Sequence, residues 1–145
     1  QGLELSDFSK KMMKITADTN VLVRACVQDD TQQAQLASEV LRKARLVAVP
    51  SVTLCEFVWV LKRAYKFVDA DIVYAIRLLI RSKNVVCDMP AVEMGLAILE
   101  QGGDFADGVI AFAGLSLGAT EFVSFDRNAV ATLKAQRKKA RLLSE

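Results

Sequence analysis

Leu46-Val47-Ala48-Val49-Pro50-Ser51 is the stretch of sequence that decides the fold. Its four apolar residues form a run of strand length, and Pro50 with Ser51 ends that run. A continuous apolar run without polar alternation is typical of a strand that is buried on both faces of a parallel sheet. Ser51 is expected to cap a helix that continues to about Tyr65. A strand that leads at once into a helix indicates a βα unit.

The alternation of strand and helix continues on both sides of this unit. Further strands are predicted at residues 14–18, 84–87 and 121–125, with an edge strand at 141–143. Further helices are predicted at 31–44 with Thr31 as N-cap, at 69–82, at 90–102, after an N-cap at Asp104, and at 128–135. The pattern predicts an α/β fold of three layers, α/β/α, around a central, mostly parallel sheet of four to five strands.

Length and composition indicate one domain. The chain has 145 residues, 52% of them hydrophobic, which suffices for a single core at residues 13–145. Residues 1–12 are mixed polar and charged and lack the apolar run of a signal peptide, so they are interpreted as a tag or leader. A formal net charge of +2 gives no strong signal for nucleic acid by itself.

The cysteines and the apolar stretches indicate the cellular compartment of the protein. Cys26, Cys55 and Cys87 lie in separate apolar segments with no C-x-x-C spacing, which predicts buried thiols in a reducing cytoplasm. The longest uncharged apolar stretch, residues 108–120, is interrupted by glycines and is shorter than the ~20 residues of a membrane-spanning helix. We therefore expect a cytoplasmic protein without a membrane span.

Acidic residues recur where a strand or turn leads into a helix. The set comprises Asp18, Glu56, Asp104, Asp107 and Asp126. Ligands of open parallel sheets bind beyond the carboxyl ends of the strands, so these side chains are expected to line one cleft. Mutual repulsion among them would then be relieved by protonation or by a bound cation.

The chain contains no histidine, and this narrows the chemistry. A histidine general base, a Ser-His-Asp triad and a histidine-ligated zinc hydrolase are all excluded. Carboxylate oxygens suit Mg²⁺ or Mn²⁺, and such ions can lower the pKa of a water that attacks a phosphodiester. Hydrolysis of a nucleic-acid backbone is the reaction that this set favours.

Four segments contain the acidic residues in series. They begin with Ile15-Thr16-Ala17-Asp18-Thr19-Asn20-Val21-Leu22 and Pro50-Ser51-Val52-Thr53-Leu54-Cys55-Glu56, and continue with Asp104-Phe105-Ala106-Asp107-Gly108-Val109-Ile110-Ala111 and Ser124-Phe125-Asp126-Arg127. Together these segments resemble the PIN domain, and more closely the VapC-type toxin ribonucleases. The resemblance covers the chain from Met13 onward. No single motif is decisive, but the four in order are specific.

The resemblance implies a Mg²⁺- or Mn²⁺-dependent endoribonuclease, the toxin of a toxin-antitoxin pair. Asp18, Glu56, Asp107 and Asp126 correspond to the acidic quartet, with Asp104 as an auxiliary ligand. Polar residues that orient the carboxylates or the water would be Thr19, Asn20 and Ser124. Implied partners are an RNA substrate, a second copy in a homodimer and a small antitoxin. One departure is Gly108, where the family commonly has Ala; small residues in this helix are expected to let it approach the sheet closely.

Structural interpretations compete with this one at single positions. Asp18, Asp104 and Asp126 taken alone can be helix caps, whereas Glu56 lies among apolar neighbours on a helix that is expected to be enclosed. Trp59 fits a core or a dimer interface, and the clusters of Lys and Arg fit solvated helix faces, a share of which contacts phosphates. A catalytically silent RNA- or protein-binding module is the alternative function. A phosphoacceptor receiver domain fits poorly, since it needs adjacent acidic residues after the first strand.

Overall fold

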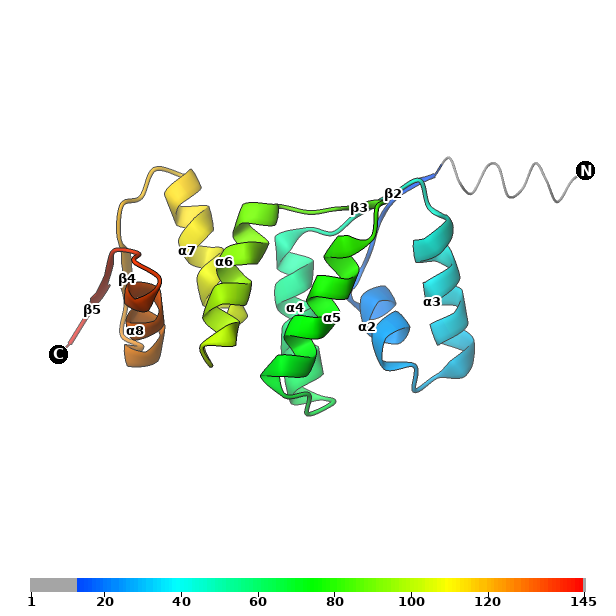
Figure 1. Ribbon diagram of the computed structural model, residues 1–145, viewed down its shortest axis with the longest axis horizontal. Coiled ribbons are helices and arrows are strands. Elements are labelled where there is room, and N and C mark those ends of the chain that lie inside the picture. Colours follow the sequence, from blue (N-terminus) through cyan, green and yellow to red (C-terminus); the bar gives the residue numbers. More distant parts are fainter. Residues whose placement is uncertain (1–12, 145) are drawn as a thin grey trace, which may run out of the picture. The chain divides into compact units, whose positions relative to one another are not determined.

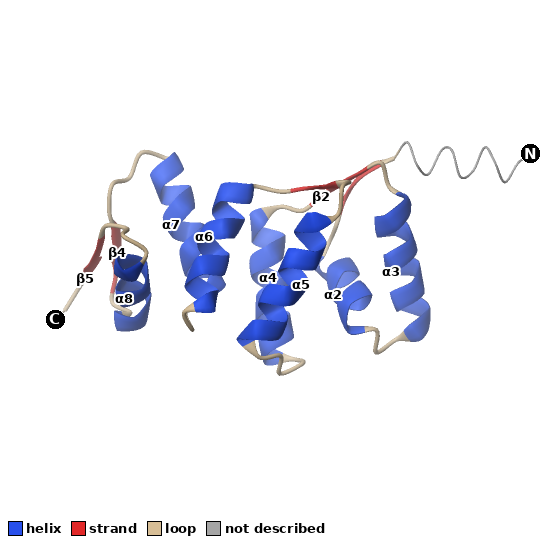
Figure 2. Cartoon of the chain, viewed as in Figure 1, coloured by secondary structure: helices blue, strands red, loops and turns tan. Residues whose placement is uncertain are grey.

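The computed structural model describes residues 13–144, so the tag or leader expected at residues 1–12 lies outside the described part. The chain divides into two compact units, with the division between Cys87 and Asp88. Each unit is described by itself. Helices make up most of both units, and the strands are short (Figure 2).

The sheet of the first unit has its predicted strand at the centre. Its strands are β1 (Lys14–Thr16), β2 (Leu46–Ala48) and β3 (Val85–Val86), paired in parallel in the order β1-β2-β3. Val47 on β2 and Val49 just after it are almost completely buried. The apolar run therefore forms the central strand that its sequence predicts, because an inner strand is covered on both faces.

Four helices accompany this sheet: α2 (Thr19–Val27), α3 (Thr31–Lys43), α4 (Ser51–Arg63) and α5 (Asp69–Arg81). Helix α2 packs beside α3 and α4, and α4 also packs beside α5 (Figure 1). Fully buried side chains from α4 and α5, among them Leu54, Leu61, Ile72 and Ile76, form much of the core of this unit. Each of these two helices thus buries its apolar face in the core of the unit.

Helix starts differ in detail from the sequence prediction. The N-cap of α3 is Asp30 rather than Thr31, since the Asp30 carboxylate accepts a hydrogen bond from the Gln33 amide at 3.0 Å. The N-cap of α4 is Pro50, without a side-chain hydrogen bond, and Ser51 is already the first helical residue. Helix α2 (Thr19–Val27) was not predicted from the sequence. In each case a neighbouring residue in extended conformation ends the preceding segment.

The second unit contains a parallel βαβ element. Strand β4 (Phe122–Ser124) leads into α8 (Arg127–Ala135), which returns the chain to β5 (Ala140–Leu142) beside β4. The predicted edge strand is therefore present. A core of Ile98, Ala111, Val130, Leu133 and Ala140 holds this element against the two preceding helices, α6 (Met89–Glu100) and α7 (Phe105–Ser116).

The backbones of α6 and α7 approach each other closely at Gly108. A Cβ atom at Gly108 would lie 2.6 Å from the Met94 carbonyl oxygen and 2.7 Å from the Gly95 Cα atom. The small residues of α7 were expected to let this helix pack closely against the sheet. Gly108 instead lets α7 pack closely against the backbone of α6. Only a residue without a side chain allows two helix backbones to approach this closely.

The strands and helices agree with the predicted fold class. Along residues 13–144, parallel strands alternate with helices, and the strands pair as one group of three and one group of two. The prediction of an α/β fold with parallel strands is confirmed. None of the helices between residues 13 and 144 combines the length and the apolar character that crossing a bilayer requires.

Candidate active site

The first unit brings together Thr19 and Glu56, which are far apart in sequence. Asp18 follows β1 and caps α2, accepting a hydrogen bond from the Thr19 amide at 2.8 Å. The side chain of Thr19, the first residue of α2, is buried and donates from Oγ1 to Glu56 Oε1 at 3.3 Å. Asn20 is exposed beside it. The start of α2 thus anchors one carboxylate oxygen of α4.

Glu56 lies on an open face of α4, contrary to the expected enclosure. Glu56 is exposed, and so are Val52 and Trp59, at 67% and 60% of their surfaces. The opposite face, with Phe57 and Leu61, is buried. A helix that is apolar all round does not reveal from sequence which face the fold leaves open.

In the second unit, Asp126 follows β4 and caps α8. Its Oδ1 atom accepts hydrogen bonds from the amides of Asn128 at 2.9 Å and Ala129 at 3.2 Å. The Asp126 amide in turn donates to Ser124 Oγ at 2.9 Å. The turn between β4 and α8 is therefore fixed on both sides of Asp126, which holds its carboxylate at the carboxyl end of the strand.

Asp104 and Asp107 lie at the start of α7. Asp104 caps the helix, accepting from the Ala106 amide at 3.1 Å. Asp107 is half-buried in the first turn and accepts no hydrogen bond from residues 13–144. Burial raises the pKa of Asp107, and the negative charges of Asp104 and Asp126 raise that pKa further. Three carboxylates of the second unit thus share one electrostatic neighbourhood.

The donor chemistry of these residues fits a hard divalent cation. Asp18, Asp104 and Asp126 each cap a helix through Oδ1, so the second carboxylate oxygen has no hydrogen-bond partner in the described chain. Asp107 is a partly desolvated carboxylate surrounded by like charge, which a cation would neutralise. The distances between these carboxylates, however, do not yet form a metal site. Between residues 13 and 144, no three Asp, Glu or Cys side chains are arranged to hold a metal ion.

The raised pKa of Asp107 gives a pH-dependent stability. Between the ordinary pKa of Asp and the raised pKa, the folded protein binds more protons than the unfolded chain, so stability falls as pH rises. We expect the Tm difference between the unmodified protein and Asp107→Asn to move steadily in favour of the variant as pH rises through this window. Thermal melts from pH 3 to pH 8 in EDTA measure it. A pH-independent difference would contradict the assigned electrostatics.

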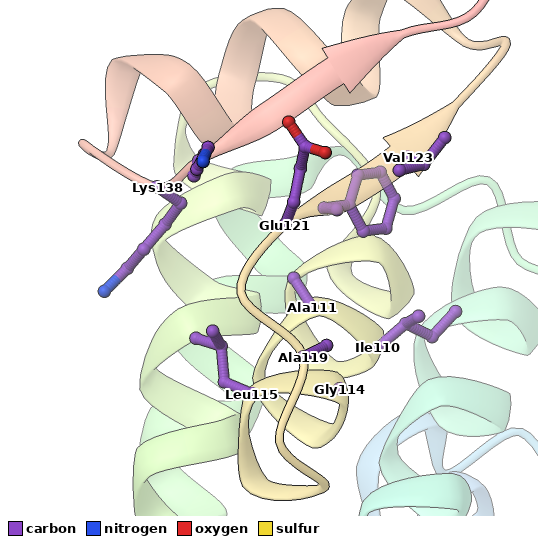
Figure 3. A pocket seen from close by; sticks show the side chains of 10 residues that line it. Ile110, Ala111, Gly114, Leu115, Ala119, Glu121, Val123 and Lys138 are labelled. Carbon is purple, nitrogen blue, oxygen red and sulfur yellow. The ribbon is translucent and has the colours of Figure 1, made fainter.

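A pocket of the second unit is separate from these carboxylates. It is formed by α7, β4 and the turn before β5, with Ile110, Leu115 and Glu121 among its lining side chains (Figure 3). Glu121 makes an ion pair with Arg141 at 3.2 Å. None of the predicted acidic ligands lines this pocket. It is an apolar recess and is distinct from the candidate active site.

The cysteines differ from their predicted place in the core. Cys26, Cys55 and Cys87 are all partly exposed. Burial raises the pKa of the Cys26 thiol above its ordinary value.

Alternating helices and parallel strands, with carboxylates at the strand ends and the following helix starts, define an α/β domain with an acidic site. The PIN domain family matches residues 15–134 of the chain. The chain therefore belongs to the PIN domain family, whose three-layer α/β/α fold is the one that its sequence predicts. PIN domains are typically metal-dependent nucleases and commonly bind Mg²⁺ or Mn²⁺. Comparison with curated proteins gives no match.

Proposed function

We propose that this PIN domain is a Mg²⁺- or Mn²⁺-dependent endoribonuclease that hydrolyses RNA phosphodiester bonds. Its catalytic carboxylates are Asp18, Glu56, Asp107 and Asp126, which also hold the cation, with Asp104 as an additional ligand. The observation that carries the proposal is the half-buried carboxylate of Asp107, raised in pKa by burial and by two neighbouring acids. Sites with this combination are candidates for function, because a purely structural carboxylate is normally paired or solvated.

The remaining residues of the site act on the carboxylates. Thr19 donates a hydrogen bond to one oxygen of Glu56 and so fixes the direction of the other. Ser124 accepts the Asp126 amide and so fixes the turn that carries this carboxylate. Asn20, which is exposed at the start of α2, would contact the phosphate or the water in this proposal. A bound divalent cation supplies activation of water and neutralises charge that develops on the phosphate.

A metal titration tests the proposed reaction. The purified protein should cleave single-stranded RNA in Mg²⁺ or Mn²⁺, stop completely in EDTA, and recover when either ion is restored in excess. Fluorescently end-labelled RNA resolved on a denaturing gel measures the cleavage. Cleavage that persists in EDTA would overturn the metal-dependent mechanism. Metal-independent binding of RNA without cleavage would instead identify a silent RNA-binding module.

We further propose that the chain is the toxin of a toxin-antitoxin pair and forms a homodimer. Support comes from exposed apolar side chains on the first unit, including Leu36 and Val40 on α3 and Tyr74 and Leu78 on α5. Exposed apolar surface of this kind is typical of protein interaction sites. Sedimentation of the protein alone, and after co-expression with the protein of the neighbouring reading frame, measures both associations.

The single domain and the cytoplasmic location are also proposals. One family match runs through residues 15–134 and so includes parts of both units, which supports one functional domain. A free thiol at Cys26 supports a reducing compartment.

A further inference from the structure

Helix α4 carries a continuous exposed stripe that includes Glu56. Its members are spaced at four, three and four residues, which places them on one helical face: Val52, Glu56, Trp59 and Arg63. All four are exposed, although residues on the opposite face of α4 are fully buried. The stripe therefore presents one proposed catalytic carboxylate, one large aromatic ring and one cation in a row.

Trp59 is the unusual member of this stripe. It is the single tryptophan of the chain, and 60% of its surface is exposed. The guanidinium of Arg63 lies over its indole ring, 5.6 Å from the ring centroid. A cation over one face holds the ring in place and leaves the remaining surface open to a flat partner. Trp59 and Val52 leave apolar surface exposed on the same face of α4 as Glu56, a combination that suits a binding surface.

We propose that the stripe Glu56-Trp59-Arg63 is an RNA contact surface, on which an unpaired base next to the cleaved bond stacks on Trp59 and an adjacent phosphate pairs with Arg63. This inference rests on the proposed ribonuclease function and adds to it the residues that hold the strand. Single-stranded RNA is recognised in proteins largely by stacking on aromatic rings beside basic side chains.

Charge along the helix favours RNA as the occupant. From Glu56 to Arg63 the helix rises by about 10 Å, a span within reach of neighbouring nucleotides of one strand. Arg63 and the exposed Lys66 beyond it have no acidic partner among residues 13–144, whereas the adjacent Lys62 pairs with Asp69 at 3.1 Å. Two uncompensated cations thus follow the aromatic ring. A second copy of the chain seated on Trp59 would also cover Glu56, one turn away, and block the proposed site.

The second unit repeats the juxtaposition of an exposed aromatic and a proposed catalytic carboxylate. Phe125 is 69% exposed and lies between Ser124 and Asp126. The hydrogen bond from Asp126 to Ser124 fixes the turn on both sides of this ring. Each unit therefore offers an exposed aromatic ring beside its acidic residues, on which an unpaired base can stack.

Because Trp59 is the only tryptophan, its fluorescence reports this contact directly. The full chain with Asp107→Asn, which we expect to bind RNA without cutting it, is titrated in Mg²⁺ with a 12-nucleotide single-stranded RNA. We expect its emission to be quenched in a saturable way. An abasic ribose-phosphate strand of the same length should bind more weakly and quench little, because it offers phosphates without bases.

Two pairs of variants separate stacking from charge. Trp59→Ala should weaken RNA binding by about 5- to 100-fold, the range of one lost stacking contact, and Trp59→Phe should restore part of it. The control is Leu117→Ala, which removes an apolar side chain that is 89% exposed at the end of α7 and belongs to neither proposed surface. Arg63→Gln should reduce the slope of log affinity against log salt by about 0.7, the contribution of one phosphate contact to a single strand. Its control is Arg81→Gln, which also removes a cation from the last turn of a helix.

The outcomes distinguish this inference from the proposed function. If the unmodified protein cleaves an RNA that neither quenches Trp59 nor depends on it, the inference is wrong and the function stands. If emission changes only with protein concentration, in step with dimer mass, the stripe is an interface between copies and the inference is likewise overturned. Absence of any metal-dependent cleavage would contradict the function itself, whatever Trp59 reports.

Discussion

Asp107→Asn should reduce metal-dependent RNA cleavage by at least about a hundredfold, because a bound cation stabilises the transition state by several kcal/mol and each ~1.4 kcal/mol is tenfold in rate. The same substitution should raise the Tm. Asp107 is half-buried, receives no hydrogen bond from the described residues and is repelled by Asp104 and Asp126, so a neutral amide removes an unfavourable charge. Loss of activity together with a gain of stability is typical of a residue kept for function.

Asp88→Asn is the matched control for this experiment. Asp88 caps α6 in the same unit, accepting from the Ala91 amide at 3.3 Å, and Asn caps a helix about as well as Asp. This control should retain full cleavage with an unchanged Tm. Cleavage rates at saturating Mg²⁺ and thermal melts in EDTA are measured for both variants. An Asp107→Asn protein with the rate of the unmodified enzyme would remove Asp107 from the catalytic set.

Gly108→Ala should destabilise the protein by about 1–2 kcal/mol and lower the Tm by roughly 3–10 °C. Helix propensity alone predicts the opposite sign, a gain of about 1 kcal/mol. The structure reverses that sign because the new methyl group would lie 2.6 Å from the Met94 carbonyl oxygen and 2.7 Å from the Gly95 Cα atom. These are backbone atoms of a neighbouring helix, so they cannot move aside as a flexible side chain would.

Gly114→Ala is the control within the same helix. Among residues 13–144, leaving out the backbone of its own helix, a Cβ atom at Gly114 would meet the Ala119 Cβ at 3.8 Å, which is an ordinary contact. This variant should therefore gain up to about 1 kcal/mol from helix propensity. Urea unfolding of the three proteins, compared at equal slope, gives both free energies. Equal stabilisation by the two substitutions would show that α6 and α7 do not pack through Gly108.

The strands and most helix bounds were predictable because each depends on local patterns. An apolar run such as Leu46 to Val49 has one favourable place in an α/β fold, and Asp104 was correctly expected to cap its helix. Caps that depend on a choice between neighbours were less predictable. Asp30 competes with Thr31 at the start of α3, and the stronger acceptor in the extended conformation caps the helix.

The sequence predicted which acidic residues form the candidate site, but it did not predict how exposed each of them is. Asp18, Glu56, Asp104, Asp107 and Asp126 were identifiable because carboxylates recur where strands lead into helices in a chain without histidine. The sequence does not indicate which of these carboxylates is buried in the folded protein. Asp107 is the half-buried one, and Glu56, expected to be enclosed, is exposed, because exposure depends on which helical faces pack against neighbours.

The sequence by itself determined the α/β class, the strand that lies at the centre of the first sheet and the acidic residues that a cation can use. Tertiary structure alone decided that Thr19 anchors Glu56, that Gly108 admits the backbone of α6, and that Trp59 faces solvent beside Arg63. The physical reason is the range of the interactions. Hydrophobic periodicity and capping act within a few residues of the chain, whereas burial, close packing and charge coupling join residues that only the folded chain brings together.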